Sequence, residues 1–186
     1  MLNLIFDPFP LITSKRLILR KITNSDVHEI FFLRSDEEVM RYIDKAPAES
    51  LDDAYDFIKK IAGLEKNTDA ITWAITLRDD PKLIGTICLW NIQKGHYRAE
   101  VGYNLHPDYW GKGIMQEAML EVLNYGFEVM MLHSIEANVN PENAASIRLL
   151  ERNKFIREAY YRENYYFNGK FLDTAIYSLL ASDYRK

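Results

Sequence analysis

Residues 100–118 read E-V-G-Y-N-L-H-P-D-Y-W-G-K-G-I-M-Q-E-A, and the rest of the chain is organised around this stretch. The first six residues alternate like a strand, and a helical pattern begins at Ile114. Between them, Gly111 and Gly113 let the main chain approach an anion because they have no Cβ atom. Free N–H groups at a helix start, at the positive end of its dipole, bind phosphate. The sequence therefore predicts a diphosphate site at this turn.

Two familiar nucleotide motifs do not fit the turn. A dinucleotide fingerprint that begins with Gly111-x-Gly113 needs a third glycine at position 116, where this chain has Gln116. No segment has the G-x-x-x-x-G-K-[ST] spacing of a P-loop. By itself the pair of glycines is a weak signal, equally compatible with a purely structural turn.

The composition is that of one globular domain spanning residues 1–186, with 48% hydrophobic and 27% charged residues. The formal net charge is -4 and the basic residues are scattered, which argues against a nucleic-acid partner. This charge mildly favours a cationic substrate such as an amine, and it serves solubility equally well. The single cysteine, Cys88, lies in an apolar run and is expected to be a buried, inert thiol.

The sequence also predicts the cellular location of the protein and the absence of a membrane span and a metal site. No apolar run approaches the roughly 20 residues of a membrane span, and no basic region precedes the apolar residues near the N-terminus. The 4 histidines have no metal-ligand spacing, so no metal is expected. We therefore expect a cytoplasmic protein without a membrane partner, either a monomer or a homodimer.

Periodicity and turn signals predict a mixed α/β order with a meander in the middle and a hairpin at the end. Strands are expected over residues 16–22, 70–77, 83–91, 97–105, 134–139, 155–166 and 171–180. Helices are expected after start signals at residues 23–26, 50–53, 113–114 and 140–142, with a short one over residues 37–42. The helix after residue 140 is expected to have Asn140 as its cap and Pro141 at its first position. Asn168-Gly169 is the signature of a tight hairpin.

A second polar group occurs in residues 137–151, A-N-V-N-P-E-N-A-A-S-I-R-L-L-E. Asn143 and Ser146 are three residues apart and therefore share one helix face. If this strand lies beside the one that ends at Leu105, then Asn138, Asn143 and Ser146 face the gap below the glycine turn. A simple capping role for Asn140, Asn143 and Ser146 at the helix start remains open.

Together with L-I-T-S-K-R-L-I-L-R (residues 11–20) and A-E-V-G-Y (residues 99–103), these segments resemble the GNAT superfamily of acetyl-CoA-dependent N-acetyltransferases. The resemblance covers nearly the whole chain and is closest to the branch that contains the ribosomal-protein N-terminal alanine or serine acetyltransferases. It implies an α/β fold of α+β type. About seven mostly antiparallel strands form a sheet, flanked by about four helices and split in a V between two parallel strands.

The resemblance also implies where acetyl-CoA binds. The pantetheine arm is expected to pair with the backbone of Tyr103, Asn104 and Leu105 in the strand over residues 97–105, and the diphosphate to lie on the amides of the turn. The implied cofactor-binding residues are Tyr103, Asn104, Leu105, Trp110, Gly111, Lys112, Gly113, Ile114, Met115, Asn138, Asn143 and Ser146. This chain departs from the family pattern at Trp110 and Met115, the first and last positions of the turn. Leu150 occupies the position where many family members have a tyrosine that protonates the leaving thiolate. Lys154 replaces the usual glycine before Phe155.

The implied reaction is direct attack of a primary amine, such as a protein N-terminus, on the thioester. Glu100 is the candidate general base, and the alternative is a strand carboxylate that only orients the substrate or pairs with Arg98. Ser146 is the candidate acid because Leu150 cannot donate a proton. Tyrosines of the terminal hairpin are candidates for the acceptor side. The alternatives are a small-amine acetyltransferase for a polyamine, aminoglycoside or amino acid, and a non-catalytic acyl-CoA sensor.

Overall fold

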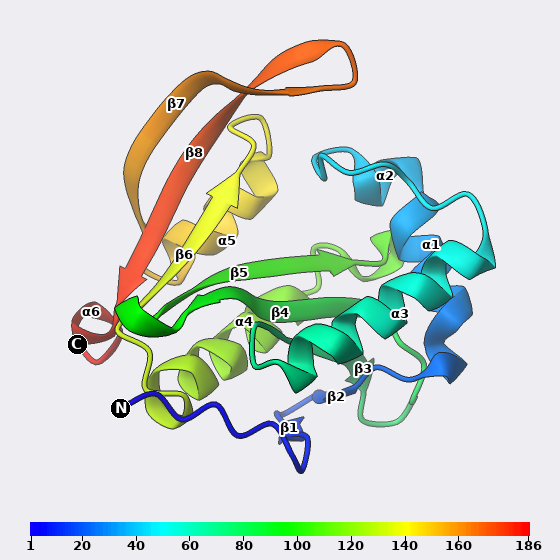
Figure 1. Ribbon diagram of the computed structural model, residues 1–186, viewed down its shortest axis with the longest axis horizontal. Coiled ribbons are helices and arrows are strands. Elements are labelled where there is room, and N and C mark those ends of the chain that lie inside the picture. Colours follow the sequence, from blue (N-terminus) through cyan, green and yellow to red (C-terminus); the bar gives the residue numbers. More distant parts are fainter.

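The computed structural model describes residues 1–186 and contains an eight-stranded sheet in the order β1-β2-β3-β4-β5-β6-β8-β7 (Figure 1). All neighbouring strands are antiparallel except β5 and β6, which are parallel. The strands are β1 Ile12–Thr13, β2 Leu17–Lys21, β3 Ile71–Leu77, β4 Gly85–Gln93, β5 Arg98–Leu105, β6 Ser134–Val139, β7 Ile156–Phe167 and β8 Lys170–Leu180. The expected mostly antiparallel α/β fold is confirmed, with β1 as an additional short edge strand.

Six α-helices accompany the sheet. They are α1 Val27–Ser35, α2 Glu37–Met40, α3 Leu51–Lys66, α4 Ile114–Asn124, α5 Ala144–Arg152 and α6 Ala181–Tyr184. The expected cap of α3 is present: Ser50 Oγ accepts from the Asp53 N–H at 3.3 Å. The hairpin between β7 and β8 is also as predicted, because Asn168 and Gly169 both have positive φ, 47° and 82°.

Alternation along the strands divides the core between the two faces of the sheet. On β3, Trp73 and Ile75 join the larger cluster, which includes Met119 of α4, whereas Ala74 joins a smaller cluster with Ile58 of α3. Helix α4 therefore packs on one face of the central sheet, and α3 packs on the other (Figure 1).

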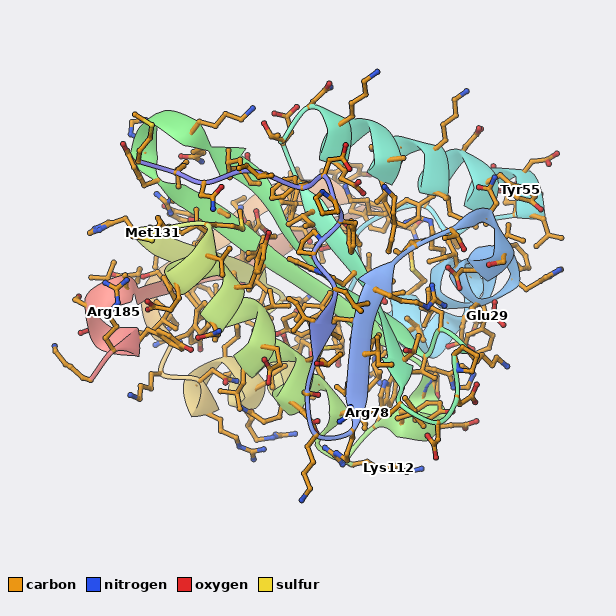
Figure 2. All side chains as sticks on the ribbon, turned by 90° about the horizontal axis from the view of Figure 1, so that it is seen from below. Glu29, Tyr55, Arg78, Lys112, Met131 and Arg185 are labelled. Carbon is orange, nitrogen blue, oxygen red and sulfur yellow. The ribbon has the colours of Figure 1, made fainter.

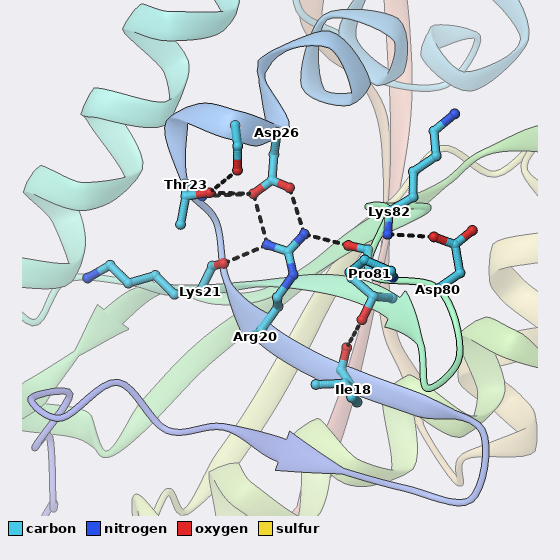
Figure 3. Close-up of polar contacts among 10 residues, drawn as sticks. Ile18, Arg20, Lys21, Thr23, Asp26, Asp80, Pro81 and Lys82 are labelled. Atoms are coloured by element: carbon cyan, nitrogen blue, oxygen red, sulfur yellow. Dashed lines mark hydrogen bonds and ion pairs between the residues drawn. The ribbon is translucent and has the colours of Figure 1, made fainter.

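An arginine holds three separate segments together at the end of β2. The Arg20 guanidinium donates to both Asp26 carboxylate oxygens at 2.6 and 2.9 Å and to the Pro81 carbonyl at 2.9 Å (Figure 3). Asp26 also accepts from the Thr23 N–H at 2.8 Å. The network joins β2 to the start of α1 and to the β3–β4 turn, so it fixes the outer half of the sheet on which α1 and α3 rest.

The predicted start of α5 was wrong. Asn140 Oδ1 accepts from the Glu142 N–H at 2.9 Å, which closes a local turn and does not begin the helix. The helix instead begins at Ala144, and Asn143 is its cap, accepting from the Ser146 N–H at 3.0 Å. The cap is therefore Asn143, for which the sequence left a capping role open beside ligand binding.

Candidate active site

The turn between β5 and α4 presents unused main-chain donors. The N–H groups of residues 111–116 donate to no protein acceptor, and the first helical bond runs from Glu117 N–H to the Gly113 carbonyl at 3.1 Å. Gly111 and Gly113 have φ values of 71° and 72°, in the region that favours glycine. Such a row of donors at the start of a helix is suited to an anion.

Arg16 of the loop before β2 fixes the direction of these donors. It donates to the carbonyls of Lys112 and Gly113 at 2.9 and 3.1 Å, and its Nε contacts the Glu117 carboxylate at 2.6 Å. In a trans peptide the C=O and N–H bonds point in opposite directions. Because Arg16 holds these two carbonyls, the N–H groups of Gly113 and Ile114 point away from it.

A cleft of about 550 Å³ lies beside the turn and is bounded by β5, α5 and the α2 region. Ten of the predicted site residues line it: Tyr103, Asn104, Leu105, Trp110, Gly111, Gly113, Ile114, Met115, Asn143 and Ser146. On the α2 side the wall includes Val39, Tyr42 and Ile43. The structure thus brings the glycine turn and the α5 polar residues to one cavity, although they are far apart in the sequence.

The V-shaped split between the parallel strands begins at Glu100. Strands β5 and β6 pair only from Arg98↔Ser134 to Glu100↔Glu136, and beyond this point they diverge (Figure 1). On its other side β5 remains paired with β4 as far as Leu105. The β6-facing edge of residues 101–105 therefore has no strand partner. Except for the Leu105 carbonyl, which accepts from Trp110, its main-chain groups are available to an extended ligand with amide bonds.

Two hydroxyl groups meet across the split. Tyr103 on β5 and Ser146 on α5 lie 2.5 Å apart, oxygen to oxygen. Burial raises the pKa of Tyr103 to about 12, and the hydrogen bond with Ser146 opposes that rise. The phenol is therefore protonated at neutral pH and can donate to Ser146 Oγ, which leaves the Ser146 proton free for a third atom.

Glu100 lies at the start of the split, on the opposite face of β5 from Tyr103, because the two positions differ by an odd number. It is 8% exposed. Burial raises the pKa of the Glu100 carboxyl and nearby Glu136 raises it further, whereas hydrogen bonds from Asn138 and Asn91 lower it, with a net increase. A carboxylate in this state is a better base than an exposed one.

Three predicted residues do not line the cleft: Glu100, Lys112 and Asn138. The Lys112 side chain is exposed and projects from the surface (Figure 2), and its main-chain carbonyl accepts from Arg16 within the turn. The Asn138 side chain lowers the pKa of Glu100, so it lies beside that carboxylate and does not line the cleft with Asn143 and Ser146. The predicted polar trio is therefore divided between the two sides of the split.

The departures from the usual family pattern have structural counterparts. Leu150 is fully buried in the main core and does not line the cleft. Trp110 donates its Nε1–H to the Leu105 carbonyl at 2.7 Å and so closes the loop between β5 and the turn. Lys154 has a φ of 66°, which explains why glycine is favoured there.

Sequence reasoning missed the Tyr103 hydroxyl and the role of Arg16. Tyr103 was chosen for its main chain, and its contact with Ser146 joins residues 43 positions apart. Arg16 contacts a turn that follows it by 96 and 97 positions. Arg16 belongs to the segment of residues 11–20 that carries part of the family resemblance, but that segment does not indicate that Arg16 contacts the glycine turn.

Comparison with known proteins identifies relatives of the whole chain. Residues 16–156 match the family described as Acetyltransferase (GNAT) domain. The chain is 39% identical to the N-acetyltransferase YoaA of Bacillus subtilis, over 92% of this chain and 97% of that protein. No helix of this structure has both the length and the apolar character needed to cross a bilayer.

Solved structures of acetyltransferases have the same fold as this chain. The spermidine N-acetyltransferase of Vibrio cholerae, in complex with CoA and spermine, has a TM-score of 0.83 at 26% identity and covers 93% of this chain and 100% of its own. The ribosomal-protein-S5-alanine acetyltransferase of Vibrio fischeri shares the fold, with a TM-score of 0.81 at 24% identity, and covers 95% of this chain and 100% of its own.

Proposed function

The chain belongs to the GNAT acetyltransferase family, an acetyl-CoA-dependent class of N-acetyltransferases, and we propose that it acetylates the α-amine of a protein N-terminus. The observation that supports this proposal most is the row of free amides at residues 111–116, beside a cleft that begins where β5 and β6 separate. An α-amine has a pKa of about 8 and a lysine side chain about 10.4, so the α-amine needs less help from a base at neutral pH.

The residues present fit acetyl-CoA. The amides of the turn suit its diphosphate, and the unpaired edge of residues 101–105 suits the amides of its pantetheine arm. When bound, acetyl-CoA supplies an acetyl thioester that an amine can attack. Under this proposal Tyr103, Asn104 and Leu105 hold the arm, and Asn143 offers the donors of its amide nitrogen while its oxygen caps α5.

Glu100 and the two hydroxyl groups take complementary roles on opposite faces of the split. As the new N–C bond forms, the amine gives a proton to the Glu100 carboxylate, whose pKa is raised by burial. As the C–S bond breaks, Ser146 donates a hydrogen bond to the departing sulfur. Tyr103 acts through Ser146 as a positioning residue, because its phenol donates to Ser146 Oγ and keeps the serine proton pointing at the sulfur.

Removal of the two hydroxyl groups provides a test of this arrangement. We expect Ser146→Ala and Tyr103→Phe each to lower kcat by about tenfold, a loss of roughly 1.4 kcal/mol in transition-state stabilisation. If Tyr103 acts only through Ser146, the double variant will be no slower than Ser146→Ala alone. Steady-state kinetics with saturating acetyl-CoA measure this, and additive losses would show that Tyr103 has an independent role.

The acceptor class is tested by thiol release from acetyl-CoA. Peptides with a free N-terminus are compared with the same peptides blocked by acetylation, and with spermidine as the small amine named in the Vibrio cholerae relative. We expect turnover with free peptides and none with blocked ones. Turnover with spermidine alone would indicate a small-amine enzyme. Binding of acetyl-CoA without thiol release for any acceptor would indicate a sensor.

A further inference from the structure

Two arginines of α5 line the cleft without a counter-ion. Arg148 and Arg152 are one helical turn apart and both belong to the cleft wall. Their guanidinium groups make no hydrogen bond and no ion pair with any other residue of the chain, in contrast to Arg16, Arg20 and Arg98. The two arginines are therefore unneutralised positive charges facing a ligand cavity.

This arrangement is costly for the free protein. Like charges at positions i and i+4 of a helix destabilise it, and neither arginine has an acidic partner that offsets the effect. The chain as a whole has a net charge of -4, so acidic residues outnumber basic ones elsewhere. A cationic strip on one cleft wall of an acidic protein fits a ligand that brings further negative charge.

The position of the strip indicates which group it meets. Ser146 and Tyr103 mark the sulfur end of the cleft, and the amides of the turn mark the diphosphate. Arg152 lies just before Asn153, whose side chain exchanges hydrogen bonds with Gln116 in the first turn of α4 at 2.7 and 3.1 Å. Along α5, Arg148 and Arg152 follow Ser146 towards this contact, so Arg152 lies at the end of the helix away from the sulfur end.

Coenzyme A carries a ribose 3′-phosphate beyond its diphosphate. We propose that Arg148 and Arg152 form a separate subsite for this monophosphate and make the protein select 3′-phosphorylated coenzyme A over its dephosphorylated form. Guanidinium groups suit the subsite because they donate paired hydrogen bonds to phosphate oxygens. The proposal rests on the proposed function, because it assumes that the diphosphate occupies the turn.

The test is a thermodynamic cycle in protein and ligand, measured by calorimetry without turnover. We expect the unmodified protein to bind coenzyme A about tenfold more tightly than 3′-dephospho-coenzyme A, as one charge-assisted contact would give. The double variant Arg148→Gln/Arg152→Gln will bind both ligands equally, with its affinity for the dephosphorylated ligand unchanged. Arg157→Gln, which removes an exposed arginine outside the cleft, will retain the preference.

Each other result overturns the proposal in a distinguishable way. Equal binding of both ligands by the unmodified protein would mean that no 3′-phosphate subsite exists, while the diphosphate site would stand. An equal loss for both ligands in the double variant would assign the arginines to the diphosphate or to general attraction. Failure of the unmodified protein to bind either ligand would remove the proposed function as well.

Discussion

Gly111→Asp is expected to abolish acetyl-CoA binding, whereas Gly111→Asn is expected to weaken it only modestly. The two side chains have nearly the same shape, and both asparagine and aspartate tolerate a positive φ such as the 71° of this residue. A Cβ atom at Gly111 would meet nothing within 4 Å, so either side chain fits. The difference between the variants therefore isolates the added negative charge.

The size of the difference follows from the distance between charges. Two unit charges about 4 Å apart at an effective dielectric constant of 20 repel by roughly 4 kcal/mol, which is a factor of about a thousand in affinity. Gly113 would give a less clear result, because a Cβ atom there would lie 3.5 Å from the Arg16 guanidinium, which would neutralise an aspartate. Apart from its two chain neighbours, nothing lies within 4 Å of a Cβ atom at position 111.

Calorimetric titration with acetyl-CoA measures both variants, and thermal melts show whether each one is folded. Equal affinities for Gly111→Asp and Gly111→Asn, in two folded proteins, would contradict the assignment of the turn to the diphosphate. A high salt concentration should narrow the gap between the variants, because screening weakens repulsion between exposed charges.

Local patterns in the sequence predicted the elements well because the signals for them are local. The Ser50 cap, the Asn168-Gly169 hairpin and the glycine turn are each set by a few adjacent residues and were confirmed. The family resemblance, which joins several such segments, predicted the split between parallel strands. The number of strands was underestimated because β1 pairs over only two residues, too few to give a periodic signal.

Contacts between distant segments were not predictable in the same way. The Tyr103–Ser146 pair depends on how far β5 and α5 are held apart, and strand alternation gives only the side of the sheet. Asn138 and Asn143 are close in sequence, but Asn138 faces Glu100 and Asn143 faces the cleft. The reason is that the chain leaves β6 between them and enters a helix, so proximity in sequence does not put side chains on one face.

Replacement of Glu100 by glutamine is expected to change both the catalytic rate and the stability of the protein. Glu100→Gln is expected to lower kcat by about 100-fold, the low end for loss of a general base, and to leave acetyl-CoA affinity nearly unchanged. The carboxylate is the active form and its pKa is raised by burial. The rate of the unmodified enzyme will therefore fall as the pH drops through this raised pKa, and the variant will lack that acidic limb.

Glu136→Gln is the matched control. Glu136 pairs with Glu100 in the strand register, forms an ion pair with Arg98, and contributes to the raised pKa of Glu100. Its removal is expected to retain most of the rate while moving the acidic limb to lower pH. A large loss of rate in Glu136→Gln, together with a near-normal Glu100→Gln, would exchange the roles of the two carboxyl groups.

Stability distinguishes a base from a carboxylate that merely supports the fold. Because the folded pKa of Glu100 lies above its unfolded value, ionisation favours unfolding as the pH rises through the folded pKa. Glu100→Gln should therefore melt at a higher temperature than the unmodified protein at neutral pH, and the two should converge below about pH 4, where glutamate is protonated in both states. A variant that is both slower and less stable at neutral pH would mean that Glu100 supports the strands and that the proton leaves the amine by another route.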